Sequence, residues 1–225
     1  MRVLRGRAVD PESDRATTQR LAAWAGDTGE PAVRVWRPHP TVAFGRRDAT
    51  RDGYDRALRT AREHGYEVVE RSVGGHAVTF TGSTVAFLRA EPVEEARTGI
   101  GTRYDRATED VAAALATVGA PVEQGEPDGA FCPGTHSLSA RGKIAGLAQR
   151  VKRDAALVSG VVVVADHDRI AEVLEPVYGA LGLPFEPTAV GSVARAGGVA
   201  DPERVVRALQ NRLATDPHVE WVRET

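Results

Sequence analysis

The stretch HSLSARGKIAGLAQRV (residues 136–151), followed by AALVSGVVVV (155–164), decides the fold class of this chain. The first stretch predicts a β-hairpin that turns at Arg141 and Gly142, and the second predicts an apolar strand. Upstream lie further β-rich segments, namely YEVVERSV (66–73), HAVTF (76–80) and TVAFLRA (84–90). Hairpins grouped in the middle of a chain favour mixed or antiparallel sheets over a doubly wound parallel sheet.

Helices are predicted before and after this β-rich middle. Apolar residues recur at helical spacing in residues 12–27, 54–65, 103–119, 168–183 and 201–214. Ser13 or Asp14, Asp168 and Asp201 are the expected N-caps, and Gly65 closes its helix. PAVRVW (31–36) and TVAFG (41–45) predict two short strands. The sequence therefore predicts an α+β fold.

Composition limits the classes of function. With 225 residues and 42% hydrophobic content, the chain can bury its own core, and we expect one domain over 1–225. A formal charge of −2 gives no overall attraction to nucleic acid or to an anionic membrane. The single cysteine forms no internal disulfide, the first residues are polar, and no apolar run approaches the ~20 residues of a membrane span. We therefore expect a soluble cytoplasmic protein.

The single cysteine, Cys132, has two interpretations. A lone cysteine is most often a small buried hydrophobic residue. Its surroundings, EQGEPDGAFCPGTHS (123–137), are rich in glycine, proline and acidic residues and are typical of a surface loop, where a substrate can reach a thiol. The sequence leaves both interpretations open.

Lys143 lies eleven positions after the cysteine. Most lysines are exposed, so a solvated hairpin residue is the ordinary expectation. The flanking GKIAGLAQ is small and apolar, however, and a charged amine in such surroundings needs an anionic partner. An ammonium within ~4 Å would stabilise a thiolate by up to about 4 kcal/mol at an effective dielectric constant near 20.

RSVGGHAVTF (71–80) places paired glycines between two predicted strands. Gly75, His76 and Ala77 would let a ligand lie against backbone N–H groups, although an ordinary turn explains Gly-Gly equally well. The chain has neither G-x-x-x-x-G-K-[ST] nor G-x-G-x-x-G, so a nucleotide would be held without those phosphate loops.

The remaining histidines and the tryptophans carry weaker signals. Asp166, His167 and Asp168 suggest a metal site, but a strand end followed by a helix cap explains them, and we predict no metal. His136 is near Cys132 in sequence and could act as a base, or it could face solvent. The tryptophans are expected in the core or at an interface: Trp24, Trp36 and Trp221.

Two motifs resemble the signature of a known superfamily. RSVGGHAV (71–78) and, further along, GKIAGLAQR (142–150) are similar to the paired motifs of the lipoate-protein ligase A, octanoyltransferase and biotin-protein ligase superfamily. TVAFGRRDATRDGYDRALRTAREHGYEVVERS (41–72) resembles its V-x-x-G-R-x-Q strand with the helix and strand that follow. The resemblance covers most of residues 30–165. His76 stands where ligases usually have a third glycine, and Thr81, Gly82 and Ser83 replace a turn that usually holds Asp and Asn.

The resemblance implies the catalytic-domain fold of these ligases and is closest to the cysteine-dependent amidotransferase branch, which has a similar Phe-Cys-Pro-Gly stretch. It implies that Cys132 is the acyl-accepting nucleophile and that Lys143 orients the acyl carbonyl and helps to hold the thiolate. The implied acyl and substrate-binding residues are Arg71, Gly74, Gly75, His76, Ala77, Val78, Gly142, Ile144, Ala145 and Gly146.

The implied reaction moves an octanoyl or lipoyl group between lysines of lipoyl-domain proteins, such as glycine cleavage H protein-like carriers and the E2 lipoyl domains of 2-oxoacid dehydrogenases. Exchange of one lysine amide for another needs no cofactor, because the bond type is unchanged. One alternative is an ATP-dependent lipoate-protein ligase that uses ATP and Mg²⁺, with or without a separate accessory subunit. Another is a non-catalytic subunit that binds an acyl carrier. The sequence does not separate octanoyl from lipoyl.

Overall fold

A computed structural model describes residues 1–71, 75–95, 98–152 and 154–222 of the chain. These residues form α-helices α1 (Pro11–Thr28), α2 (Tyr54–Glu63), α3 (Ile100–Thr117), α4 (His167–Leu181) and α5 (Pro202–Leu213), and a short 3₁₀ helix, Pro187–Ala189. They also form strands β1 (Arg2–Arg5), β2 (Ala32–Trp36), β3 (Thr41–Phe44), β4 (Glu67–Glu70), β5 (Val78–Phe80), β6 (Val85–Pro92), β7 (Glu123–Gln124), β8 (Ser137–Ser139), β9 (Lys143–Val151), β10 (Ala155–Val162) and β11 (His218–Trp221).

The strands form two mixed sheets. The larger sheet has the strand order β11-β1-β2-β6-β10-β9-β8-β7, and the smaller has the order β4-β3-β5. In the larger sheet β1 runs parallel to β2 and β11, while the pairs from β2 to β7 are antiparallel. In the smaller sheet β3 is parallel to β4 and antiparallel to β5. This confirms the predicted α+β class with mixed sheets.

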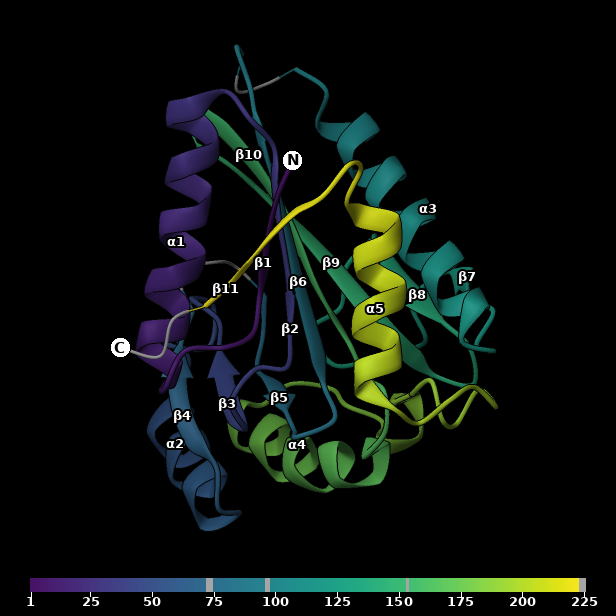
Figure 1. Cartoon of the computed structure of the whole chain (residues 1–225). Helices are drawn as coiled ribbons and strands as arrows, with labels where there is room; N and C mark the ends of the chain where they lie inside the picture. Colours follow the sequence, from purple (N-terminus) through teal and green to yellow (C-terminus); the bar gives the residue numbers. More distant parts are fainter. Residues whose placement is uncertain (72–74, 96–97, 153, 223–225) are drawn as a thin grey trace.

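Helices cover both faces of the larger sheet. Figure 1 shows α1 on one face and α3 with α5 on the other. Because side chains alternate along a strand, each central strand contributes to both layers. Val33 and Val35 of β2 pack in the core beneath α3 and α5, whereas Ala32 packs in the separate cluster beneath α1.

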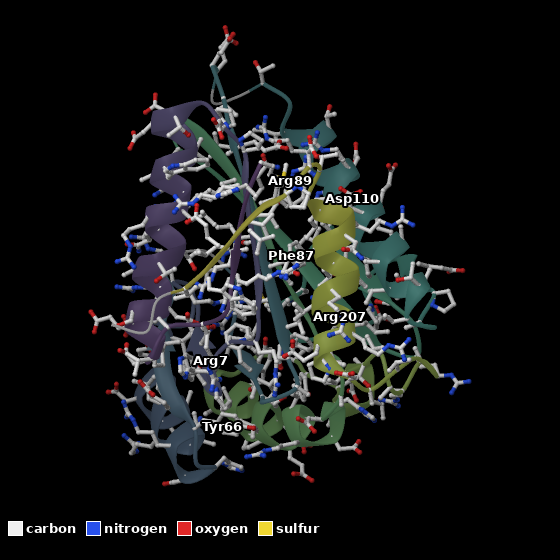
Figure 2. The ribbon with its side chains drawn as sticks, viewed as in Figure 1. Arg7, Tyr66, Phe87, Arg89, Asp110 and Arg207 are labelled. Atoms are coloured by element: carbon white, nitrogen blue, oxygen red, sulfur yellow. The ribbon has the colours of Figure 1, made fainter. Side chains whose placement is uncertain are left out.

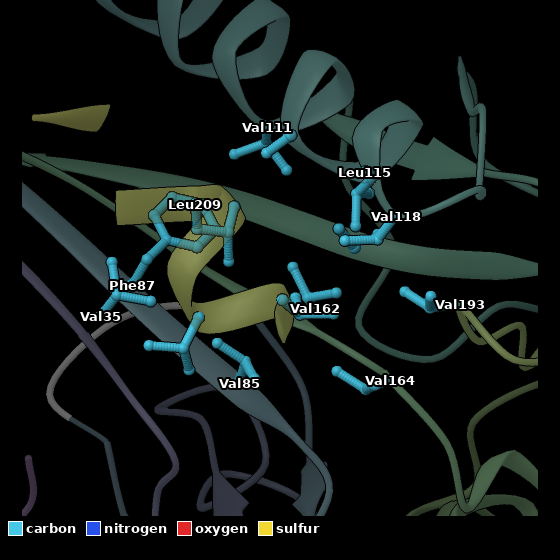
Figure 3. Packing of buried hydrophobic residues seen from close by; sticks show 14 of the residues in the cluster. Val35, Val85, Phe87, Val111, Leu115, Val118, Val162, Val164, Val193 and Leu209 are labelled. Carbon is cyan, nitrogen blue, oxygen red and sulfur yellow. The ribbon is translucent and has the colours of Figure 1, made fainter. Parts of the chain in front are cut away.

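The main core lies between the larger sheet, α3 and α5. Phe87 of β6 packs there with Val111 and Leu115 of α3 and Leu209 of α5 (Figure 3). Gly160 in β10 is required by this packing, because a Cβ there would lie 2.4 Å from Cζ of Phe87. A glycine in the middle of this strand therefore reflects a large aromatic neighbour rather than a break in the strand.

The smaller sheet packs with α2 and α4 in a second core. This cluster contains Val42 and Phe44 of β3, Ala57 of α2, and Leu174 and Tyr178 of α4. Figure 1 shows α4 along the lower end of the molecule, beside β5. The candidate site forms where this second core meets the hairpin β8–β9 of the larger sheet.

The predicted hairpin is confirmed. Strands β8 and β9 are joined through Arg141 and Gly142, which adopt φ values of 50° and 114°. Gly142 also approaches another segment closely, since a Cβ there would lie 2.6 Å from the backbone nitrogen of Gly191. The predicted helices and central strands are likewise present, with small shifts at their ends.

Two of the predicted helix caps are wrong. Helix α1 is capped by Asp10, whose side chain accepts from the Ser13 backbone N–H at 2.8 Å, not by Ser13 or Asp14. Asp14 serves a different purpose, described below. The residue before α4 is Asp166, not Asp168. The cap of α5 at Asp201 is confirmed, because its Oδ1 accepts from the Glu203 N–H at 2.9 Å.

The sequence did not predict β1, β7 or β11. Each is short, with no more than four residues, and all three lie at or next to the edges of the larger sheet. Their sequences carry charged residues rather than the apolar alternation of a buried strand. In the part of the chain that the structure describes, no helix has both the length and the hydropathy that a bilayer span requires.

A buried ion pair holds α1 on the sheet. Nη2 of Arg34, on β2, lies 2.5 Å from Oδ1 of Asp14, and both side chains are buried. Asp14 Oδ1 also accepts from the Ala8 N–H at 2.7 Å. The Arg34 guanidinium lies 4.3 Å from the ring centroid of Trp36. The pair thus fixes the position of Trp36, which lines a cavity described below.

On the opposite face, β6 and α3 are joined by a more exposed ion pair. Arg89 lies beside Asp110 in Figure 2, with Nη1 and Oδ2 separated by 3.4 Å. Arg89 also pairs with Glu91 of its own strand at 2.8 Å. Such part-exposed pairs contribute less than about 1 kcal/mol each, so the apolar core carries most of the stability of this interface.

Replacement of the buried arginine tests the role of the pair under α1. We expect Arg34→Met to lower the free energy of unfolding by about 3–5 kcal/mol, because Asp14 would stay buried without a cation. Arg2→Met is the matched control: it breaks a part-exposed pair with Glu220 and should cost less than about 1 kcal/mol. Urea unfolding of both variants measures the difference, and equal losses would contradict this account.

Candidate functional site

Cys132 lies in the loop that precedes the β8–β9 hairpin, and helix α4 fixes its backbone. The Cys132 N–H donates to the hydroxyl of Tyr178 at 2.6 Å, and that hydroxyl donates to the carbonyl oxygen of Ala77 at 2.9 Å. Burial is the main cause that raises the pKa of Tyr178, and the neighbouring Cys132 adds to it. The phenol therefore keeps the proton that it donates. One side chain therefore joins the cysteine loop to the glycine turn.

The conformation of Cys132 is unusual for a residue with a side chain. Its φ is 42°, in the left-handed region, which costs a non-glycine residue about 1 kcal/mol or more. Its side chain is half-buried. The surface loop predicted around it is therefore present, but the thiol lies at a boundary rather than free in solvent.

The sulfur lies against the glycine turn. Sγ accepts from the His76 backbone N–H at 3.4 Å and from Nη2 of Arg71 at 3.9 Å. Arg71 Nη2 also donates to the His76 carbonyl oxygen at 2.5 Å. Gly75 must be glycine here, because its φ is 89° and a Cβ would lie 2.7 Å from Sγ. A backbone amide and a guanidinium thus both contact the sulfur.

Lys143 holds the cysteine loop through its side-chain ammonium. Its side chain is 2% exposed, and Nζ donates to the carbonyl oxygens of Phe131 at 3.0 Å and Cys132 at 2.8 Å. Nζ also lies 3.0 Å from Oε1 of Glu126. The predicted need for an anionic partner is thus met by Glu126. Among the described residues, the cation that donates to the sulfur is Arg71, and Lys143 donates to the Cys132 carbonyl instead.

Glu126 connects the two ends of the loop. Its Oε2 accepts from the Gly134 N–H at 2.8 Å and from the Ser137 hydroxyl at 2.5 Å, in addition to Lys143. These acceptor roles suit an ionised carboxylate. The loop from Glu126 to Ser137 is therefore closed around the Lys143 ammonium, with Cys132 held at its inner side.

His76 forms a second polar pair beside the sulfur. Its Nδ1 lies 2.7 Å from Oδ1 of Asp48, and the other carboxylate oxygen accepts from the Gly45 N–H at 2.8 Å. Asp48 is fully buried and the His76 side chain is 14% exposed. Gly45 touches the glycine turn directly, because a Cβ there would lie 2.0 Å from the Gly75 carbonyl oxygen.

An apolar cavity of about 500 Å³ reaches Arg71 from the other side. It lies between the start of α1, the β2–β3 connection, β4 and β5. Its apolar side chains include Trp36, Ala43, Val68, Val69, Phe80 and Ala86. Arg71 both lines this cavity and contacts Sγ of Cys132, so one residue is shared by the cavity and the thiol.

The other predicted binding residues lie at different places. Gly74 is outside the described residues. Ala77 and Val78 are buried in the second core, Ile144 and Ala145 in the main core. In the hairpin, Gly142 forms the turn and Gly146 faces Lys143, where a Cβ would lie 3.2 Å from Cε. Apart from Arg71, none of the described members lines the 500 Å³ cavity.

The weaker sequence signals fall outside this site. In the described part of the chain, no group of three metal-ligating side chains is found, and His167 Nδ1 lies 3.0 Å from the Ser192 hydroxyl. The ring of His136 stacks on Tyr104, with centroids 3.7 Å apart. Trp221 is 69% exposed, so it is not a core residue.

Sequence reasoning missed Tyr178, Glu126 and Asp48. Tyr178 lies on the buried side of α4, where the helical pattern predicts core packing and nothing marks its hydroxyl. Glu126 is one of several acidic residues in its loop. Asp48 follows a strand and precedes a helix, which is ordinary for a turn. The apolar surroundings of Lys143 indicated that its amine needs an anionic partner, but they did not show that this partner is Glu126.

Comparison with known proteins gives a family match. The model of the lipoyl protein ligase A/B catalytic domain matches residues 10–211. The octanoyl-[GcvH]:protein N-octanoyltransferase of Geobacillus kaustophilus (strain HTA426) is 36% identical over 130 residues, which are 57% of this chain and 46% of that protein. The lipoyl-[GcvH]:protein N-lipoyltransferase of Listeria monocytogenes serovar 1/2a is 28% identical over 145 residues, 64% of this chain and 52% of that protein. The matches thus span about half the length of these relatives.

Solved structures share the fold. A lipoate-protein ligase A bound with ATP superposes with a TM-score of 0.75 at 18% identity, over 99% of this chain and 89% of that one. A putative lipoate protein ligase from T. acidophilum with bound lipoic acid gives a TM-score of 0.70 at 20% identity, over 98% and 90%. At these identities the likeness concerns the fold alone.

The role of Lys143 can be tested against the second lysine of the chain. Lys143→Met would leave Glu126 and two loop carbonyls without their donor, and we expect the free energy of unfolding to fall by about 2–4 kcal/mol. Lys152→Met, at an exposed position, should change it by less than about 0.5 kcal/mol. Denaturant unfolding measures both. A loss for Lys143→Met no larger than that for Lys152→Met would show that the loop does not depend on this amine.

Proposed function

Because the chain belongs to the lipoyl protein ligase A/B catalytic domain family, we propose that it transfers an octanoyl or lipoyl group between lysines of lipoyl-domain proteins through a thioester on Cys132. The observation that carries this proposal is the position of the thiol. Sγ is contacted by the His76 N–H and by Arg71, a residue that also lines a cavity with apolar walls. Cys132, Arg71 and Lys143 are the central residues of the proposed site.

The cavity suits an acyl chain. Trp36, Val69 and Phe80 offer apolar walls, and burial of each methylene group contributes about 0.8 kcal/mol. A chain that extends from the cavity past Arg71 would bring its carbonyl carbon to the sulfur. Both octanoyl and lipoyl groups are medium-length and apolar, and the cavity admits either.

The proposed reaction has two acyl transfers. In the first, the Cys132 sulfur gives up its proton and attacks the amide carbonyl of an acylated carrier lysine, and the C–N bond breaks to release the lysine amine. In the second, an acceptor lysine amine attacks the thioester, and the C–S bond breaks. Each transfer passes through a tetrahedral oxyanion, which the His76 N–H and the Arg71 guanidinium are placed to stabilise.

Lys143 acts on the backbone in this proposal. Its ammonium is bonded to the carbonyl oxygen of Cys132 and to Glu126, so its effect on the reaction is to hold the nucleophile in its left-handed conformation. This differs from the expectation that it holds the thiolate directly. These hydrogen bonds, together with the bond from the Cys132 N–H to the Tyr178 hydroxyl, offset the free-energy cost of the left-handed conformation of Cys132.

The acyl carriers that we propose are taken from the names of the relatives. The names of the Geobacillus and Listeria proteins give GcvH as their acyl donor, and GcvH is the glycine cleavage H protein. We therefore assign an H protein-like domain as donor and an E2 lipoyl domain as acceptor. Exchange between two lysine amides is nearly thermoneutral, and so the proposed transfer consumes no nucleotide.

Intact-mass spectrometry after mixing the protein with an octanoylated lipoyl domain, without nucleotide, tests the proposal. The wild-type protein should gain one octanoyl group on Cys132 and pass it to a second carrier. In Cys132→Ser, transfer should fall by more than about 1,000-fold, while Tyr104→Phe, away from the thiol, should stay near the wild-type rate.

Adding free octanoate, ATP and Mg²⁺ to the same mixture distinguishes the ligase alternative from the proposed transferase. Carrier modification that requires ATP and survives Cys132→Ser would replace the transferase proposal with the ligase. Absence of both activities, with retained carrier binding, would favour a non-catalytic subunit.

A further inference from the structure

We propose that His76 is the proton-transfer residue of this site and that Asp48 positions it, so that Cys132, His76 and Asp48 act together. This inference rests on the proposed function, and it concerns how protons reach and leave the reacting groups. Each half of the reaction needs one proton moved at the sulfur and one at a lysine nitrogen. Arg71 does not supply that step, because a guanidinium keeps its protons in proteins.

The backbone of His76 contacts the reacting atom. The His76 N–H is bonded to Sγ of Cys132 at 3.4 Å, so the imidazole belongs to the residue that already contacts the nucleophile. Arg71 holds the carbonyl of the same residue at 2.5 Å. With its N–H and its C=O both engaged, His76 has a defined position beside the thiol.

Asp48 determines which ring nitrogen is available. Oδ2 of Asp48 accepts from the Gly45 N–H, and Oδ1 lies 2.7 Å from Nδ1 of His76, where a carboxylate accepts from the ring. Nδ1 must then carry a hydrogen, and Nε2 is the nitrogen that gains or loses a proton. Because Asp48 is fully buried, it cannot turn toward solvent, and the ring orientation is fixed.

Three other titratable groups that contact Cys132 or its loop are engaged in hydrogen bonds. Lys143 uses its ammonium on Glu126 and on two backbone carbonyls. Glu126 is occupied by Lys143, Ser137 and Gly134. The hydroxyl of Tyr178 is bonded on both sides, and burial raises its pKa. Within the described residues, no hydrogen bond is found for Nε2 of His76, whose backbone N–H contacts Sγ.

In this proposal, Nε2 of His76 takes up and releases every proton that the reaction moves. Nε2 takes the thiol proton of Cys132 as the sulfur attacks, and gives it to the donor lysine nitrogen as the C–N bond breaks. In the second half, Nε2 takes a proton from the attacking lysine nitrogen and returns it to the sulfur as the C–S bond breaks. Nothing is oxidised or reduced, and the residues end in their starting protonation states.

A comparison of two acyl donors tests the role. With an octanoylated lipoyl domain the leaving group is a lysine nitrogen, which must be protonated. With p-nitrophenyl octanoate the leaving phenolate departs without a proton. In His76→Ala, acylation of Cys132 by the carrier should fall about 100- to 10,000-fold, and acylation by the ester less than about 10-fold. Added imidazole should restore part of the carrier rate. Asp48→Asn should show the same selective loss.

His136→Ala is the matched control, since it removes a histidine four positions from Cys132 whose ring stacks on Tyr104. Its rates with both donors should stay within about 3-fold of wild type. Equal losses with both donors in His76→Ala, without imidazole rescue, would make His76 a structural residue and overturn the inference, as would a carrier rate that does not change. A wild-type protein that reacts with the ester but never with the carrier would instead contradict the proposed function, and the assignment of His76 to that reaction would fall with it.

Discussion

The buried ammonium of Lys143 is the interaction on which the site depends. An ammonium has three hydrogens, and Lys143 finds an acceptor in each of three groups: the Phe131 carbonyl, the Cys132 carbonyl and the Glu126 carboxylate. A charge removed from water needs such full satisfaction. The loop is consequently wrapped around the amine, and the cysteine keeps a left-handed backbone conformation that it would not adopt alone.

This constraint joins the two halves of the molecule. The hairpin β8–β9 that carries Lys143 belongs to the larger sheet, whereas Arg71 and the glycine turn follow the strands of the smaller one. Tyr178 of α4 reaches both, through Cys132 and Ala77. The thiol is therefore positioned by contacts from segments far apart in the chain. The cavity that Arg71 lines is also lined by Asp14 and Trp36, and both of these residues contact Arg34.

The sequence predicted what depends on local pattern. The hairpin at Arg141 and Gly142, the central strands and the helices follow from periodicity and turn residues, and Cys132, Lys143 and Arg71 became candidate site residues through motif resemblance. Long-range pairing was not predictable. No spacing shows that Lys143 would choose Glu126 over the thiol, that His76 would meet Asp48, or that Tyr178 would hold Cys132, because these pairs are up to 46 positions apart in sequence. The edge strand β11 and its neighbour β1 were missed because their charged residues hide any alternation.

The central claim is that acyl groups pass through Cys132, and rapid-quench kinetics of a single turnover test it most directly. An octanoylated donor domain is mixed with the protein and an acceptor domain without nucleotide, and the acyl group on each is followed over time. The account predicts that acyl-Cys132 forms before the acylated acceptor and decays at the rate at which that product appears. Acylated acceptor that accumulates while Cys132 stays unmodified, or a thioester that forms more slowly than the product, would contradict it.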